Sequence, residues 1–168
     1  MRKEFLVIRD NITNRAEKEQ KINKAVLSLI KDSYLVLSYM STKSEVSTDF
    51  INQNIKNLAL PLVSGDCLIP KLVTDIKKDT KLGSFSIREP LEHLPTATNI
   101  DFIIVPGVCF SPDKNRIGYG KGFYDRFLCD KDIIKVGICF EEQMVKKIPT
   151  DNFDIEVDCI ITDKYLYK

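Results

Sequence analysis

One loop, residues 111–128, holds the densest group of residues that could do chemistry: it reads SPDKNRIGYGKGFYDRFL. Three glycines, Gly118, Gly120 and Gly122, alternate along it. Glycine lets the backbone come close to a ligand, and a helix that starts just after them would present free N–H groups and the positive end of its dipole. Arg116 and Lys121 add two cationic side chains. These features indicate a site for a phosphate group.

The loop differs from two common phosphate-binding motifs. It lacks the GxxxxGK[ST] sequence of a Walker A loop, and its glycines do not have the GxGxxG spacing of dinucleotide-binding folds. The glycine pattern alone therefore leaves two interpretations open, a phosphate-binding loop or an ordinary tight connection into a helix.

Two acidic residues could bring a metal ion to this loop. Asp125 is expected in the first turn of the helix after the glycines, and Asp158 interrupts the apolar run at residues 157–161. Mg²⁺ is usually held by one or two carboxylates together with substrate phosphates. A first-turn carboxylate can equally interact with the helix dipole, and an acid in a strand can face solvent. From the residues alone, the structural interpretation is preferred.

The rest of the chain predicts helices that alternate with strands. Residues 14–31 have apolar side chains at helical spacing behind a capping signal at Asn14 and Glu17. Further helices are expected from about Thr48, over 121–129 and over 141–147. Apolar runs at 34–40, 101–110, 133–140 and 157–161 are typical of strands buried in a parallel sheet, and weaker strands are expected at 58–63 and 67–73.

This order of elements predicts an α/β fold: a single domain over residues 1–168, with an open, mostly parallel sheet and helices on both faces. Ligands of such sheets bind beyond the carboxyl ends of the strands. The loop after residues 101–105 is the richest in polar and glycine residues, so we expect the site there.

Composition excludes several classes of function. Among 168 residues, 25 Lys and Arg balance 24 Asp and Glu, so no overall charge favours nucleic acid or an anionic membrane. The apolar run at residues 5–8 is too short for a signal peptide. The five cysteines have no CxxC spacing and are expected to be reduced thiols. We therefore expect a cytoplasmic protein.

The sequence IGYGKGFYDR, preceded by a strand with Pro-Gly and by Arg116, resembles the signature of the 5-formyltetrahydrofolate cyclo-ligase family, also called methenyltetrahydrofolate synthetases. The similarity extends to a basic N-terminal helix and to SYMSTKSEVST, LALP, GSFSIREP and FDIEVDCIITD. It implies conversion of 5-formyltetrahydrofolate into 5,10-methenyltetrahydrofolate with ATP and Mg²⁺. In that reaction the formyl oxygen attacks the γ-phosphate, N10 closes the ring, and ADP and phosphate are released.

The resemblance also assigns roles to individual residues. It implies that Arg116, Lys121 and Tyr124 act in catalysis. The residues that it assigns to ATP are Arg2, Lys3, Arg116, Gly118, Tyr119, Gly120, Lys121, Gly122, Phe123, Tyr124 and Asp125. Those that it assigns to the folate are Met40, Glu45, Tyr119, Gly120, Phe123 and Tyr124. Asp125 and Asp158 match the magnesium positions.

Some of these assignments have alternatives. The family often has a lysine three residues before a Leu-Arg pair, which is missing here or replaced by Lys3. Glu45 would, from sequence alone, be an exposed charge in a loop. Tyr39 and Met40 could line a folate site, but their position at the end of an apolar strand favours a place in the hydrophobic core. The only histidine, His93, is expected at the surface.

Two other functions compete with a cyclo-ligase. One is another phosphate-handling α/β enzyme, such as a sugar-phosphate isomerase or a CoA transferase, although we find no motif for the catalytic Glu of a CoA transferase. The other is an RNA-binding module built on Lys18, Lys21 and Lys24, but acidic residues interleave with these lysines. The expected partner is a reduced folate, with or without a polyglutamate tail. We expect a monomer that binds neither nucleic acid nor membrane.

Overall fold

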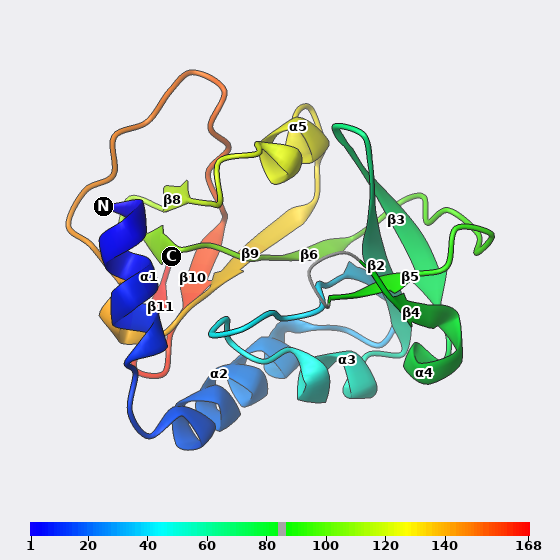
Figure 1. Cartoon of the computed structure of the whole chain (residues 1–168), viewed down its shortest axis with the longest axis horizontal. Coiled ribbons are helices and arrows are strands. Elements are labelled where there is room, and N and C mark those ends of the chain that lie inside the picture. The colour runs from blue at the N-terminus through cyan, green and yellow to red at the C-terminus, as the bar shows by residue number, and fades with distance from the viewer. Residues whose placement is uncertain (84–86) are drawn as a thin grey trace.

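A seven-stranded sheet forms the centre of the computed structural model, which describes residues 1–83 and 87–168 (Figure 1). Its strands lie in the order β11 (Leu166–Tyr167), β10 (Cys159–Ile161), β9 (Ile134–Ile138), β6 (Phe102–Val105), β1 (Leu35–Leu37), β2 (Asn57–Ser64) and β3 (Cys67–Val73). The five inner strands run parallel, and β11 and β3 pair antiparallel at the two edges. The predicted mostly parallel α/β sheet is confirmed. Residues 84–86 of the GSFSIREP segment lie outside the described residues.

Apolar side chains on both sides of the inner strands explain this sheet. All four residues of β6 are buried. Because side chains alternate along a strand, Phe102 and Ile104 pack into the core on one face, whereas Ile103 and Val105 pack into the core on the other. A near-continuous apolar run is thus what a doubly covered parallel strand requires.

Helices cover both faces, as predicted (Figure 1). On one face lie α2 (Arg15–Leu29) and α3 (Asp49–Asn54), which contribute Ile22, Val26 and Ile51 to the core. The short helix α5 (Phe123–Leu128) packs on the opposite face through Leu128. The N-terminal helix α1 (Arg2–Asp10) lies at one end of the sheet, near the 3₁₀ turn η2 (Glu141–Gln143). A fifth helix, α4 (Ile76–Asp79), follows β3.

The predicted strand at 101–110 is split. Pro106 and Gly107 end β6 and lead into a small hairpin of β7 (Cys109–Phe110) and β8 (Arg116–Ile117). Gly107 leaves room for the ring of Phe110, since a Cβ on Gly107 would come within 2.5 Å of it. Another two-stranded sheet pairs β4 (Thr80–Leu82) with β5 (Arg88–Pro90).

Two local predictions are wrong. The helix expected at 141–147 is only the turn η2, because the Val145 N–H donates to the Phe110 carbonyl (2.8 Å) and so leaves the helical pattern. The capping signal also fails: Asn14 precedes α2 in a left-handed conformation without a side-chain cap, and Glu17 pairs instead with Lys21 (2.7 Å). The helix itself forms as predicted.

Other expectations from composition agree with the structure. All five cysteines are free thiols, and Cys109 and Cys139 are buried. His93 is exposed, as expected. Among the described residues, no helix has the length and apolar character that a membrane span requires.

Candidate active site

The glycine loop, residues 118–122, connects β8 to α5 and lies beside α1 (Figure 1). Gly120 and Gly122 have φ values of +90° and +65°, which residues with a side chain rarely adopt. Arg2 of α1 donates from Nε to the Gly118 carbonyl (2.8 Å). Its guanidinium also lies over Gly120, where a Cβ would come within 3.1 Å of Nη1. Glycine at position 120 therefore suits the turn and leaves room for the Arg2 guanidinium.

The backbone of this loop is rich in unused donors. The N–H groups of residues 118–122 donate to no acceptor in the described part of the chain. Lys121 is exposed and forms no ion pair with a described residue. Lys3 is exposed as well, but it makes no hydrogen bond to the loop, in contrast to Arg2. A run of free N–H groups beside cationic side chains is suited to an anion such as phosphate.

Arg116 and Asp125 form a mostly buried ion pair. Arg116 Nη2 lies 2.7 Å from Asp125 Oδ1, and the two side chains are 5% and 25% exposed. The Ile155 N–H donates to the same oxygen (3.2 Å), and Arg116 Nη1 donates to the Ile155 carbonyl. The pair thus fastens α5 to the segment before β10. Asp125 Oδ2 has no hydrogen-bond partner among the described residues.

Asp158 does not lie where the sequence predicts. It precedes β10 and so stands at the amino end of that strand, not within it and not at the carboxyl edge. Its Oδ2 accepts a hydrogen bond from the Lys135 backbone N–H (2.6 Å) and lies 3.4 Å from Lys135 Nζ. The described residues contain no group of three or more His, Cys, Asp or Glu that could hold a metal. A magnesium site on Asp125 and Asp158 stays a prediction.

Glu45 lies in the loop that follows β1, and it is only 8% exposed. The alternative of a solvated surface charge is therefore wrong. Its Oε2 accepts hydrogen bonds from the backbone N–H (2.8 Å) and hydroxyl (3.3 Å) of Thr42. Its Oε1 accepts one from the Tyr119 hydroxyl (3.1 Å). A residue predicted to bind folate thus touches the predicted ATP loop, 74 positions later in the chain.

Three tyrosines surround this carboxylate, and each has a raised pKa. Burial is the main cause for Tyr39 and Tyr124, and partial burial is the main cause for Tyr119, which is 50% exposed; the negative charge of Glu45 raises each pKa further. Arg9 opposes this for Tyr119, as Arg116 does for Tyr124. The hydroxyls therefore stay protonated at neutral pH and can donate hydrogen bonds. Tyr39 itself is a core residue, 5% exposed, as its strand position suggests.

Arg9 is a site residue that the sequence marked only as part of the basic N-terminal helix, without a role of its own. It is 1% exposed, donates to the Tyr119 hydroxyl (2.7 Å) from Nη2, and its Cζ lies 5.7 Å from the Tyr119 ring centre. Its position four residues after the buried Phe5 places it on the inner face of α1. That spacing was the signal available in the sequence.

Of the predicted folate residues, Met40 lies apart from Glu45, at a cavity of about 660 Å³ beside α3 and α4. Lys56, Lys77 and Arg88 also line this cavity, together with Asp49 and Asp75. Phe123 lies in α5, against the core, with its ring below the Arg126 guanidinium (5.4 Å).

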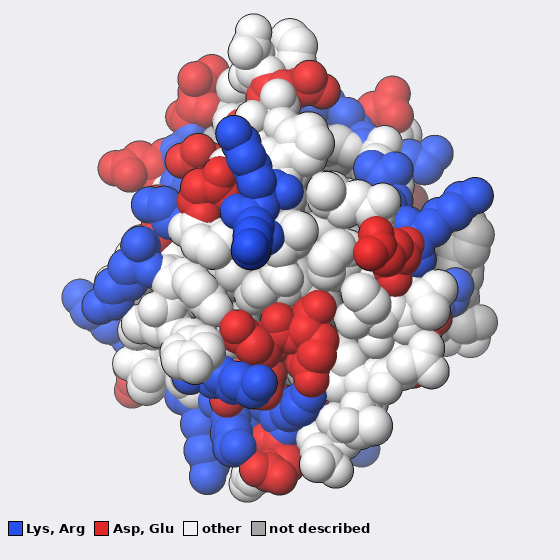
Figure 2. All heavy atoms as spheres, turned by 90° about the vertical axis from the view of Figure 1, so that its left-hand side faces the viewer, with Lys and Arg blue, Asp and Glu red and all other residues white. Residues whose placement is uncertain are grey.

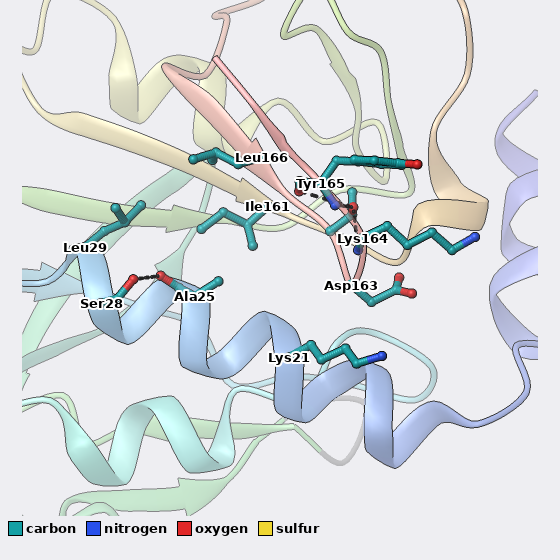
Figure 3. Close-up of a pocket in the computed structure, with 10 residues that line it drawn as sticks. Lys21, Ala25, Ser28, Leu29, Ile161, Asp163, Lys164, Tyr165 and Leu166 are labelled. Carbon is teal, nitrogen blue, oxygen red and sulfur yellow. Dashed lines mark hydrogen bonds between the residues drawn. The ribbon is translucent and has the colours of Figure 1, made fainter.

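A separate cavity of about 330 Å³ lies between α2 and the β10–β11 hairpin (Figure 3). Apolar Leu29, Ile161 and Leu166 line one part of it, and Lys21, Asp163 and Lys164 lie toward the other. None of the predicted site residues lines it.

The face that includes α1 does not resemble a nucleic-acid surface. Figure 2 shows basic and acidic side chains next to each other in several small groups on it, with uncharged surface between the groups. On α2, Lys18 pairs with Glu142 and Lys21 pairs with Glu17, so two of the three lysines of the RNA-binding hypothesis already have acidic partners.

The fold and the site together define a class: an α/β protein in which a glycine-rich, cationic loop meets a buried carboxylate. Comparison with known proteins identifies the member of that class. A model of the 5-formyltetrahydrofolate cyclo-ligase family matches residues 1–163, and this chain belongs to that family. It is therefore an enzyme, and the RNA-binding and CoA-transferase hypotheses are set aside.

Individual relatives agree over most of the chain. The 5-formyltetrahydrofolate cyclo-ligase of Haemophilus influenzae is 30% identical, covering 92% of this chain and 91% of the relative. The Saccharomyces cerevisiae enzyme of the same name is also 30% identical, over 87% of this chain and 84% of its own. The solved structure of Aquifex aeolicus 5,10-methenyltetrahydrofolate synthetase has a TM-score of 0.86 and 32% identity, covering 99% of this chain and 90% of that one.

Proposed function

We propose that this enzyme converts 5-formyltetrahydrofolate into 5,10-methenyltetrahydrofolate, with ATP converted to ADP and phosphate. The observation that supports it best is the hydrogen bond between Glu45 and Tyr119. It joins the residue that would bind the folate to the loop that would bind ATP, as transfer of a phosphoryl group between the two ligands requires.

For ATP, we propose the glycine loop as the phosphate site. Its free N–H groups would donate hydrogen bonds to phosphate oxygens, with Arg2 and Lys121 as the nearest cations. The aromatic side chains next to the nucleotide would be those of Tyr119, Phe123 and Tyr124. Lys3 would contribute only if its side chain turned toward the loop. Arg116 would act through Asp125, to which it is already paired.

For Mg²⁺, the donors present fit a hard cation that prefers oxygen and keeps several waters. Asp125 Oδ2 and Asp158 Oδ1 have no hydrogen-bond partner in the described part of the chain, so each carboxylate has one oxygen free. We propose Asp125 as a ligand, directly or through water, with Asp158 as a second ligand once its carboxylate turns from Lys135 toward Asp125. When bound, the ion would neutralise negative charge on the phosphates.

For the folate, we propose Glu45 and Tyr124 as the polar and aromatic contacts of the pterin. The cavity at Met40 would take the arm of the substrate, because Lys56, Lys77 and Arg88 suit the carboxylates of one or more glutamates. An apolar wall with a few placed charges is typical of small-molecule sites.

The chemistry needs little covalent work from the protein. The oxygen of the N5-formyl amide is a poor leaving group, so it must be activated before N10 can close the ring. We propose that it attacks the γ-phosphate of ATP, releasing ADP, and that ring closure then expels phosphate. The protein positions the two ligands and neutralises charge, for which Lys121 and the loop N–H groups are placed. No Ser, Cys or His nucleophile is required.

We also propose that the enzyme is cytoplasmic and monomeric. Its five cysteines are free thiols, and this is typical of a reducing compartment.

One assay tests the proposal directly. Purified enzyme is mixed with 5-formyltetrahydrofolate, and the absorbance of the methenyl product is followed with and without MgATP. We expect product only with MgATP, and one ADP for each methenyl group. Product without ATP, or ATP hydrolysis without product, would contradict the proposal. The Lys24→Ala variant, changed at an exposed position of α2, is the matched control.

A further inference from the structure

We propose that Arg9 is a positioning residue, which holds Glu45 and Tyr119 in the arrangement that receives the folate; this inference rests on the proposed function. Arg9 is 1% exposed. No acidic side chain lies within ion-pair distance of it in the described part of the chain. Arginine is almost never fully buried unless it is paired, so its burial here calls for a specific role.

Two chains of hydrogen bonds leave the Arg9 guanidinium. Nε donates to the Ser44 hydroxyl (3.1 Å), which in turn donates to the Asp10 carboxylate. Nη2 donates to the Tyr119 hydroxyl (2.7 Å), which donates to Glu45 Oε1 (3.1 Å). Each hydroxyl therefore stands between the cation and a carboxylate. The third nitrogen, Nη1, is buried and has no hydrogen-bond partner.

These contacts bring three distant segments to one side chain. Arg9 lies in the last turn of α1, whose other end contacts the glycine loop through Arg2. Ser44 and Glu45 belong to the loop after β1, and Tyr119 belongs to the glycine loop. Burying a cation costs several kcal/mol, and two neutral hydroxyls offset this only in part. A requirement of the substrate for fixed positions of Glu45 and Tyr119 would explain why the fold buries this cation.

The shape of the guanidinium is essential to this role. Its planar fork directs Nε toward Ser44 and Nη2 toward Tyr119 at the same time. A lysine at this position would keep the charge but would end in one nitrogen without that fixed geometry. Arg9→Lys therefore separates positioning from charge, and Tyr119→Phe removes only the hydroxyl that joins Arg9 to Glu45.

The test is a double-mutant cycle with Arg9→Lys, Tyr119→Phe and the combination. For each protein we would measure kcat, the KM for the folate, the KM for MgATP and the melting temperature. Each single variant should raise the folate KM roughly tenfold, and Arg9→Lys should change the MgATP KM by no more than about twofold. Because both changes break one chain of contacts, the double variant should be no worse than the poorer single. Tyr165→Phe, in the exposed β10–β11 hairpin, is the matched control and should behave like wild type.

Several outcomes would overturn the inference. Additive effects on the folate KM would mean that Arg9 does not act through Tyr119. A lower melting temperature with both KM values unchanged would make Arg9 a structural residue only. If Arg9→Lys does not fold, Tyr119→Phe alone decides the question. An unchanged folate KM in Tyr119→Phe would exclude a role for the hydrogen bonds that join Arg9 to Glu45 through Tyr119. Absence of methenyl product from the wild type would instead refute the proposed function.

Discussion

Replacing Asp125 by Asn probes an ion pair that the structure makes central to the site. The variant keeps an oxygen that can accept hydrogen bonds from Arg116 and Ile155 but removes the negative charge. Arg116, whose side chain is 5% exposed, then loses its counter-ion. Breaking a fully buried pair costs roughly 3–5 kcal/mol. Asp125 is 25% exposed, and the neutral hydrogen bonds persist, so we expect a loss of about 2 kcal/mol.

This loss is measurable without unfolding the protein. Domains have about 5–15 kcal/mol of stability, and for a chain of this size about 2 kcal/mol lowers the melting temperature by roughly 4–8 °C. The assay is thermal and urea denaturation of wild type, Asp125→Asn, Arg116→Gln and the double variant. The double variant should be more stable than the sum of the single losses predicts, by about 1–2 kcal/mol. Strict additivity, with wild-type stability of Asp125→Asn, would refute the energetic reasoning.

The same variants test the magnesium proposal through a different readout. If Asp125 and Asp158 hold one ion, Asp→Asn at either position should raise the Mg²⁺ concentration that gives half-maximal activity. The double Asp→Asn variant should be only modestly worse than the poorer single. A destabilised Asp125→Asn with an unchanged Mg²⁺ requirement would leave Asp125 a structural role alone.

Three further predictions concern single residues. Lys121→Ala should reduce kcat/KM for MgATP by about 10²-fold or more with an unchanged melting temperature. Steady-state kinetics, with Lys24→Ala as the control, check this. Near-wild-type kinetics would exclude Lys121 from the phosphate site. Glu45→Gln should raise the folate KM far more than the MgATP KM, because an amide replaces only some of the hydrogen bonds that Glu45 accepts; equal changes in both KM values would contradict a role at the folate. Burial raises the pKa of the Cys109 thiol from 9.0 to about 11. As the pH rises, the unfolded chain therefore loses this proton at a lower pH than the folded protein does. The free energy of unfolding should fall by up to about 3 kcal/mol between pH 9 and pH 11. Denaturation of wild type and Cys109→Ala across this range measures it, and an equal slope in both proteins would exclude Cys109 as the cause.

The sheet could be predicted because its strands are buried on both faces, which leaves near-continuous apolar runs in the sequence. Boundaries were harder, since they depend on contacts between distant residues. Just after β6, the Phe110 ring packs where Gly107 and Gly137 have no side chain. The helix expected at 141–147 does not form because the Val145 N–H donates to the Phe110 carbonyl, more than 30 positions earlier, and not to a helical partner. Neither contact follows from local spacing.

The site shows the same division between local and distant information. The positive φ values of Gly120 and Gly122 follow from their residue type, and the free donors of the loop follow from that turn. The burial of Glu45 does not, because the carboxylate becomes buried only when Tyr119 and Thr42 close around it. The prediction for Asp158 fails for a similar reason: its strand starts two residues later than the apolar run suggests. Arg9 is the strongest case, since a basic residue in a charged helix looks solvated until the fold buries it against two loops. The glycine turn of the phosphate half is therefore encoded locally, whereas the contacts of Glu45 form only after folding, so substitution of Arg9 should disturb folate binding before it disturbs ATP binding.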